Sequence, residues 1–307
     1  MLDVALLGCG RWGTNHLRVL SELRDLKLIR YITVVDPLSD ARKLAILADE
    51  TVESLDGVEA DLVIIATPSH MHANQARNAM TAGYHVLVEK PLGCCEAEAA
   101  QVLATAIEHG RVIGVGLLLR FHPAIKLVKK LLVTGKIGRL ESLQFIRRTI
   151  RKAPEGGNVV EALGVHAIDL LCHIMGEVEP SAVHATGDEI EARVALEFSH
   201  GIEAIIDLAW GAENEIRTVE LIGNSGIIRF DLDIHDQISL IIGGNEVVIP
   251  CESSYSPLEA EVRHIIEAIE ANKAGLDWTT VPEHGPALRG VRLTERAIRA
   301  MPLVRRH

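Results

Sequence analysis

The chain has 307 residues and a formal net charge of −11, and 48% of its residues are hydrophobic. Its length favours two domains, and its apolar content excludes an intrinsically disordered protein. The acidic charge disfavours nucleic acid or an anionic membrane as a partner, because no net basic field attracts either. No apolar run approaches the ~18 residues of a transmembrane helix.

The N-terminal residues carry no basic leader, and the five cysteines are odd in number without a C-x-x-C pair. No signal peptide is therefore expected, and the cysteines are typical of reduced thiols in a cytoplasmic protein.

The first strand, expected at residues 4–7, leads directly into a G-x-G-x-x-G motif at Gly8, Gly10 and Gly13. Gly8 suits a tight strand-to-helix turn, Gly10 lets the backbone approach a pyrophosphate, and Gly13 allows close helix packing. The helix expected at residues 15–23 would direct its free N–H groups and positive dipole end to the phosphates. This arrangement predicts a dinucleotide site.

Asp36 ends the second expected strand, residues 29–35, and can bind the adenosine ribose hydroxyls. It lies farther from Gly8 than the usual ~20 residues, which a long first helix explains. Its carboxylate would repel a 2′-phosphate, and Pro37 follows it instead of an arginine. We therefore expect NAD as the cofactor, with NADP less favoured.

Strands and helices alternate as far as Arg120. Further strands are expected at residues 62–66, 85–88 and 111–116, and helices at residues 39–48, 72–82 and 96–109. This alternation predicts an α/β Rossmann domain over residues 1–120, a doubly wound parallel sheet.

The pattern changes after Arg120. Helices are expected at residues 123–132, 160–175, 257–274 and 286–301. Strands are expected at residues 140–150, 182–186, 193–199, 203–210, 218–222, 226–231, 238–242 and 246–249. Consecutive strands with short turns predict an α+β substrate-binding domain over residues 121–307, built on a mostly antiparallel sheet. Ligand is expected between the two domains, at the carboxyl ends of the parallel strands.

Four later segments complete a recognisable pattern: Thr67-Pro68-Ser69-His70-Met71-His72, Glu89-Lys90-Pro91, Leu119-Arg120-Phe121-His122-Pro123, and Gly164-Val165-His166-Ala167-Ile168-Asp169. Together with the glycine motif they make the chain resemble the Gfo/Idh/MocA family, named for glucose–fructose oxidoreductase, inositol dehydrogenase and rhizopine catabolism. The opening with Trp12, Asn15 and His16 is similar to the branch that acts on nucleotide-linked sugars.

This resemblance implies an NAD(P)-dependent dehydrogenase or reductase that moves hydride to or from a sugar-type carbon, without a metal. Lys90 and His166 are the implied catalytic residues, with neutral His166 taking the hydroxyl proton. The cofactor is then expected to contact Gly8, Gly10, Arg11, Trp12, Gly13, Asp36, Thr67, Pro68, His72, Glu89 and Lys90.

The chain departs from the family at Ala162, where D-x-G-x-H would place an aspartate one turn before His166. Glu161 lies about 100° around a regular helix from that position and is a poor substitute. Asp169 could orient His166 instead. Otherwise Lys90 and His166 act as a pair, or the chemistry is altered.

A basic run, Arg147-Arg148-Thr149-Ile150-Arg151-Lys152, stands out in this acidic chain. Guanidinium groups match phosphate geometry, so Arg147 and Arg151 are candidates for a phosphate-bearing substrate, although a solvated surface or a dimer rim explains them equally well. Arg120 is the better single candidate for substrate contact, together with Asp169. A sugar-like small molecule is thus the expected substrate.

One face of the second domain's sheet carries Ile202, Ile206, Leu208 and Trp210 among alternating polar residues. A sheet with helices on only one side leaves its other face to solvent or a partner, which predicts a homodimer or homotetramer. Two other classes compete with the enzyme. Ala162 motivates an NAD-binding pseudo-enzyme with a regulatory or scaffold role, which the presence of Lys90 and His166 disfavours. A methyltransferase also uses a glycine-rich first loop, but the Glu89-Lys90-Pro91 segment disfavours it.

Overall fold

The computed structural model describes residues 1–252 and 255–301, and its packing separates the chain into two compact units. The first contains Met1–Leu118 and Leu258–Val291, and the second contains Leu119–Pro257 and Arg292–His307 as far as they are described. Among the described residues no helix is long and apolar enough to cross a membrane.

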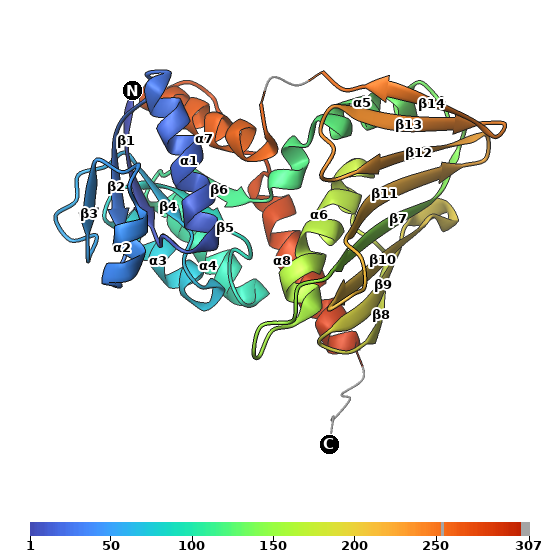
Figure 1. Ribbon diagram of the computed structural model, residues 1–307, viewed down its shortest axis with the longest axis horizontal. Helices are drawn as coiled ribbons and strands as arrows, with labels where there is room; N and C mark the ends of the chain where they lie inside the picture. Colours follow the sequence, from blue (N-terminus) through green and yellow to red (C-terminus); the bar gives the residue numbers. More distant parts are fainter. Residues whose placement is uncertain (253–254, 302–307) are drawn as a thin grey trace. The chain divides into compact units, whose positions relative to one another are not determined.

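The first unit is built on a six-stranded parallel sheet in the order β3-β2-β1-β4-β5-β6 (Figure 1). Its strands are β1 (Leu2–Leu7), β2 (Ile29–Val35), β3 (Glu50–Val52), β4 (Leu62–Ile65), β5 (His85–Glu89) and β6 (Ile113–Gly116). The order reverses between β1 and β4, which makes this a Rossmann sheet whose ligand crevice lies at that switch point. The predicted doubly wound sheet is confirmed.

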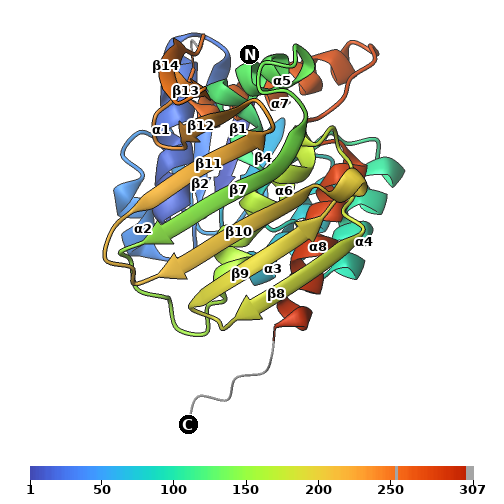
Figure 2. The same cartoon turned by 90° about the vertical axis from the view of Figure 1, so that its right-hand side faces the viewer.

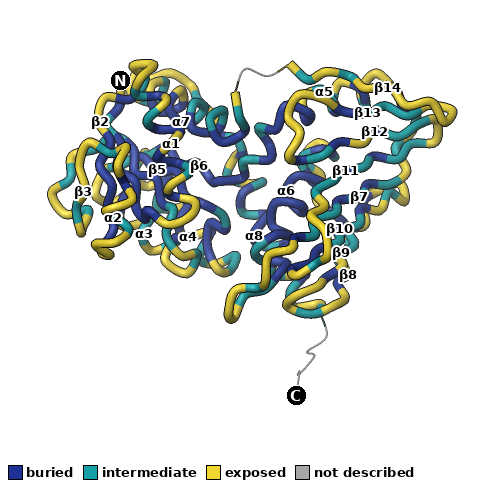
Figure 3. Tube along the Cα trace, in the orientation of Figure 1, coloured by how far each residue is buried: buried dark blue, intermediate teal, exposed yellow. Residues whose placement is uncertain are grey.

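Helices cover this sheet, and most residues of β1, β2 and β4 are therefore buried (Figure 3). The helices are α1 (Arg11–Asp25), α2 (Ser39–Leu44), α3 (Ser69–Thr81), α4 (Glu96–Glu108) and α7 (Pro257–Lys273). One core cluster joins the strands to α1 and α7, and α3 packs against α4.

Helix α7 belongs to the first unit although it follows residue 250. Its buried side chains, including Val262, Ile265 and Ile269, lie in one cluster with Leu6 and Leu20. The sequence pattern divides the chain once, at residue 120, and so assigns these residues to the second domain. In the structure they pack with the first unit, because an apolar helix face is buried against whichever sheet offers a matching surface. The two-domain division at residue 120 stays a prediction.

The second unit contains an eight-stranded sheet in the order β14-β13-β12-β11-β7-β10-β9-β8 (Figure 2). Its strands are β7 (Leu140–Thr149), β8 (Ala182–Gly187), β9 (Glu191–Glu197), β10 (Glu203–Trp210), β11 (Ile216–Gly223), β12 (Gly226–Asp231), β13 (Gln237–Ile242) and β14 (Asn245–Pro250). All neighbours are antiparallel except β7 and β10, so the predicted mostly antiparallel sheet is confirmed.

The helical segments of this unit include α5 (Pro123–Val133), the π-helical turn η2 (Val160–Gly164), α6 (Val165–Ile174) and the part of α8 (His284–Ala300) that follows Val291. Ile206, Leu208 and Trp210 are buried, and η2 and α6 pack against β10. These three side chains therefore lie on the covered face of the sheet. Figure 2 shows the opposite, open face toward the viewer.

Three local elements differ from the sequence expectation. β3 was not predicted, because its three residues are too few to show a periodicity. α2 ends at Leu44 instead of residue 48, and the single helix expected at residues 160–175 is split into η2 and α6. Boundaries of short elements are the least determined part of a sequence pattern.

Candidate cofactor and catalytic site

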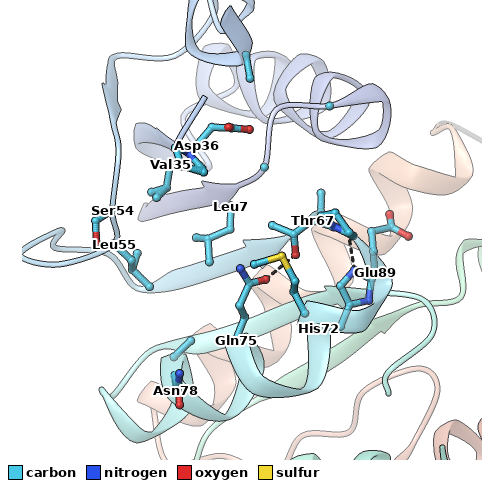
Figure 4. A pocket seen from close by; sticks show the side chains of 18 of the residues that line it. Leu7, Val35, Asp36, Ser54, Leu55, Thr67, His72, Gln75, Asn78 and Glu89 are labelled. Carbon is cyan, nitrogen blue, oxygen red and sulfur yellow. Dashed lines mark hydrogen bonds between the residues drawn. The ribbon is translucent and has the colours of Figure 1, made fainter. Parts of the chain in front are cut away.

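A pocket of about 1140 Å³ opens at the carboxyl ends of the first unit's strands (Figure 4). Leu7 ends β1, Val35 ends β2 and is followed by Asp36, and Glu89 ends β5. Parallel strands bring these ends to one edge of the sheet, where ligands bind in open α/β folds. The pocket includes ten of the eleven predicted cofactor residues, all except Gly13.

The glycine motif has the conformations that its spacing predicts. Gly8 has φ of +88°, and a Cβ there would lie 2.9 Å from the carbonyl oxygen of Ala66. A Cβ on Gly13 would lie 2.0 Å from the carbonyl oxygen of Gly8, so α1 can approach the turn only with glycine there. A Cβ on Gly10 would meet no protein atom within 4 Å, which leaves the backbone open to a ligand on the pocket side.

Asp36 is 7% exposed and holds the turn together through backbone amides. Its Oδ2 accepts a hydrogen bond from the N–H of Cys9 (2.9 Å), and its Oδ1 accepts one from the N–H of Leu38 (2.9 Å). A carboxylate has about four acceptor positions, so Asp36 keeps capacity for two ribose hydroxyls.

Thr67, Pro68 and His72 link the end of β4 to the start of α3. The imidazole of His72 is 2% exposed and lies between two carbonyl oxygens, 2.8 Å from that of Thr67 and 2.9 Å from that of Pro91. The Thr67 hydroxyl donates to Gln75 Oε1 (2.5 Å). His72 therefore connects the loops after β4 and β5 and fixes the wall of the pocket (Figure 4).

The side chain of Glu89 contacts His16 on α1. Its Oε1 lies 2.8 Å from Nε2 of His16, and both side chains are buried, with 6% and 1% exposed. Its Oε2 accepts a weak hydrogen bond from the N–H of Lys90 (3.3 Å). Lys90 follows β5 and lines the pocket together with Trp12, which is 36% exposed.

In the second unit, Arg120 is the centre of a buried ion-pair cluster. Its guanidinium donates to both oxygens of Asp169 (2.7 and 2.6 Å) and to Glu177 (2.7 and 3.3 Å). Burial alone would lower the pKa of Arg120, but Asp169 and Glu177 outweigh burial and raise it. The pair holds α6 to the turn at residue 120. Substrate contact by Arg120 and Asp169 stays a prediction.

His166 lies in the first turn of α6 and is 5% exposed. Before it, the N–H of Val165 bonds the carbonyl of Val160, five residues back, so η2 is one residue wider than an α-turn. The regular-helix spacing used above for Glu161 therefore does not apply across this turn. Single π-turns of this kind are frequent at functional sites.

The basic run does not form one patch. Along β7, Arg147 shares a face with Phe145, which is fully buried, and is paired in register with Leu208. Arg148 lies on the opposite face and donates to Asp207 (2.8 and 3.0 Å). Arg151 lies beyond the strand and is exposed. Strand alternation thus separates residues that are adjacent in the sequence.

Sequence reasoning missed one residue of the pocket wall and one buried carboxyl of the first unit. Gln75 on α3 lines the pocket and holds Thr67, and Glu261 on α7 is a buried carboxyl whose pKa is raised by burial and by the charge of Glu89. The i, i+3 arrangement of His72 and Gln75 on one helix face was a usable signal for the first. The second had none, because nothing local in residues 257–273 places them against β5.

A doubly wound sheet, a tight glycine turn and a strand-end carboxylate at one pocket define a dinucleotide-binding protein of the Rossmann class. A family model described as "Oxidoreductase family, NAD-binding Rossmann fold" matches residues 2–117, and one described as "GFO/IDH/MocA C-terminal domain" matches residues 125–229. The chain belongs to the Gfo/Idh/MocA family of oxidoreductases.

Individual relatives are distant. Inositol 2-dehydrogenase of Rhizobium meliloti is 24% identical, with 96% of each chain covered. UDP-N-acetylglucosamine 3-dehydrogenase GnnA of Acidithiobacillus ferrooxidans has a TM-score of 0.84 at 22% identity over 98% of this chain and 97% of that one. GenD2 from gentamicin A biosynthesis, solved with NAD, has a TM-score of 0.80 at 26% identity over 97% and 93%. With two other relatives the match spans only 65% and 54% of the relative's length.

Proposed function

We propose that the protein is an NAD-dependent dehydrogenase or reductase that transfers hydride between NAD and a sugar-type carbinol or ketone, including nucleotide sugars and sugar phosphates. The observation that carries this proposal is the pocket that brings Asp36, Glu89 and Lys90 together at the strand ends. The names of the relatives support it, since they act on inositol and on a nucleotide sugar. None of these relatives supports the scaffold alternative.

The pocket fits a dinucleotide. The backbone at Gly10 is open on the pocket side, and the N–H groups at the start of α1 suit a pyrophosphate. Asp36 has acceptor capacity for the adenosine ribose, and Glu89 for the nicotinamide ribose. When bound, NAD supplies a ring carbon that accepts or returns hydride. The protein positions the reacting carbon and handles the proton.

Oxidation of a carbinol releases one hydride and one proton, so the protein needs a group that takes the proton. We assign this role to neutral His166 and to Lys90, each acting on the reacting hydroxyl. In the reverse direction the same groups return the proton to the carbonyl oxygen. Pro91 fixes the backbone after Lys90 and so holds the lysine at the end of β5.

We assign the substrate contacts from the charges of the candidate side chains. Arg147 and Arg151 would bind a phosphate-bearing substrate, whereas a neutral cyclitol needs neither. Arg120 and Asp169 would contact the substrate's polar groups from the second unit. For the whole molecule we propose a cytoplasmic homodimer or homotetramer that pairs through the open face of the eight-stranded sheet. Light scattering that gives a mass of 33.4 kDa at micromolar concentration would contradict this assembly.

One screen tests the proposed function. Purified protein is incubated with NAD and, in parallel, with a cyclitol, a sugar phosphate or a nucleotide sugar, and NADH formation is followed at neutral and alkaline pH. Turnover with one of these classes is the expected result. Tight NAD binding without turnover on any class, in either direction, would overturn the proposal.

A further inference from the structure

Arg42 on α2 lies against the turn that carries Asp36, but it does not line the cofactor pocket. Its Nη1 donates to the carbonyl oxygens of Asp36 (2.7 Å) and Pro37 (3.1 Å), and its Nη2 donates to Oε1 of Glu53 (2.8 Å). The guanidinium is therefore held by two backbone carbonyls and one carboxylate. The described hydrogen bonds of the Asp36 carboxylate come from backbone N–H groups and not from this guanidinium.

Strand β3 places Glu53 beside this turn. The N–H of Asp36 donates to the carbonyl oxygen of Val52 (3.0 Å), which ends β3, and Glu53 is the next residue. Glu53 and Asp36 both line the pocket, as do Ser54 and Leu55 after them (Figure 4). The ends of two neighbouring strands therefore bring two carboxylates to the part of the pocket where the adenosine ribose is expected.

This part of the pocket is where NAD and NADP differ. NADP carries a phosphate on the 2′ oxygen of the adenosine ribose, and in Rossmann sites a nearby arginine accommodates it. Arg42 is an arginine next to that position, but its guanidinium already has a carboxylate partner. A 2′-phosphate would have to displace Glu53 from Arg42, and Glu53 would remain at the pocket wall as a second negative charge beside Asp36.

We propose that Glu53 is a specificity-determining residue: it holds Arg42 in the turn between β2 and α2, where the guanidinium is not available to a 2′-phosphate. Asp36 and Glu53 then act in different ways, since Asp36 accepts the ribose hydroxyls and Glu53 occupies the arginine. A change at Asp36 alone leaves Arg42 occupied, so part of the preference for NAD should survive it. This inference rests on the proposed function in taking a nicotinamide dinucleotide as the pocket's ligand.

The ion pair can be altered without loss of the fold. The Glu53 side chain is 76% exposed and that of Arg42 is 18% exposed, and exposed ion pairs contribute little to the free energy of unfolding. Neutralising Glu53 leaves Arg42 held by its two backbone carbonyls, with its charge uncompensated. Its fork of N–H donors then suits a phosphate, which it can bind through two hydrogen bonds.

The first test compares Glu53→Gln with Glu50→Gln, which removes the same charge from an exposed position of β3 outside the pocket. Fluorescence titration measures the affinity for NAD and for NADP at two ionic strengths. We expect Glu53→Gln to bind NADP about tenfold more tightly than the wild type and NAD within about threefold of it. The gain for NADP should shrink at the higher ionic strength. Glu50→Gln should behave as the wild type.

A second test identifies Arg42 as the group that is released. Arg42→Leu keeps an apolar stem and removes the charge. In the double variant Glu53→Gln/Arg42→Leu the gain for NADP should be lost, and NAD should still bind within about threefold of the wild type. A gain that persists without Arg42 would show that Glu53 acts through its charge alone, and this outcome would overturn the inference.

The titrations also separate this inference from the proposed function. If the wild type binds NAD but Glu53→Gln gains nothing for NADP, or Glu50→Gln gains as much, only this inference is overturned. If the wild type binds neither dinucleotide, the proposed function is overturned as well. Glu53→Ala, which introduces no amide, should show the same gain as Glu53→Gln. Loss of NAD affinity in both variants would mean that Glu53 supports the turn itself, contrary to the inference.

Discussion

The two units build their candidate sites in different ways. In the first unit, Gly8, Asp36 and Thr67 follow strands and Glu89 ends one, and a parallel sheet gathers strand ends at one edge. In the second unit, the candidate residues depend on which partner each side chain finds, and Arg120 finds Asp169. Position in the first site thus follows from topology, and position in the second follows from side-chain pairing.

The proposed catalytic residues come one from each unit, Lys90 from the first and His166 from the second. We expect Lys90→Ala and His166→Ala each to reduce turnover by roughly 10²–10⁴-fold with nearly unchanged NAD affinity, since neither group grips the pyrophosphate. Steady-state kinetics and cofactor titration measure both quantities. The double variant should lose little more than either single one, because both groups act on one proton. Multiplying losses would contradict a shared role.

Arg120→Ala tests whether the second unit's cluster is structural. The substitution leaves the Asp169 carboxylate buried without its cation, and breaking such a pair costs about 3–5 kcal/mol in the free energy of unfolding. Urea unfolding measures the loss. Arg229→Ala, which breaks an exposed pair with Glu220, is the control and should cost at most ~1 kcal/mol. Similar losses in the two variants, with a raised KM for Arg120→Ala alone, would favour a substrate-binding role.

Low pH should reduce the free energy of unfolding of both units, and one buried histidine in each unit should contribute to the loss. Burial, with a contribution from Arg111, lowers the pKa of His85 to about 4, and burial, with His235, lowers that of His122 to about 4. The unfolded chain then binds more protons than the folded one below pH ~6.5, so stability is present above that pH and is lost as pH falls toward 4. Each histidine should contribute up to about 3 kcal/mol to this loss.

Urea unfolding between pH 7 and pH 4 checks this expectation. His85→Gln and His122→Gln should each flatten the fall, and His70→Gln, at an exposed position of α3, should leave it unchanged. A steep fall that neither buried substitution alters would mean that other groups govern acid unfolding.

The smallest expected effect is the preference for NAD over NADP, which tests Asp36 alone. NAD should bind at least about tenfold tighter than NADP, or ~1.4 kcal/mol, because the Asp36 charge repels a 2′-phosphate. Asp36→Asn should narrow this ratio, as fluorescence titration of both cofactors can measure. Equal affinities in the wild type would show that Asp36 does not select the cofactor.

Much of the fold could be predicted because the spacing of apolar residues along the sequence indicates which faces of a helix or strand are buried. The parallel strands are continuous apolar runs, and the second sheet's strands alternate and are separated by short turns. The glycine turn could be predicted in detail, since Gly8 has a backbone conformation that other residues rarely adopt. The family resemblance supplied Lys90 and His166, which spacing alone does not identify.

The rest depended on contacts between residues far apart in the chain. The π-turn before His166 follows no local sequence rule, so the spacing of a regular helix could not describe residues 160–164. A basic run in the sequence does not say where its side chains point, and the strand sends Arg147 and Arg148 to opposite faces. The packing of α7 on the first sheet could not be predicted, because an amphipathic helix pattern does not name the surface it will cover.

The placement of α7 also determines the order in which this protein can mature during its synthesis. Domains generally fold as units, with the N-terminal one first as the chain leaves the ribosome. Here the first unit lacks Val262, Ile265 and Ile269 of its core until the whole eight-stranded sheet has been translated. The N-terminal segment is made first, but its hydrophobic core is complete only after α7 has been made. Until then the apolar surface that α7 covers stays exposed, and chaperones can bind it.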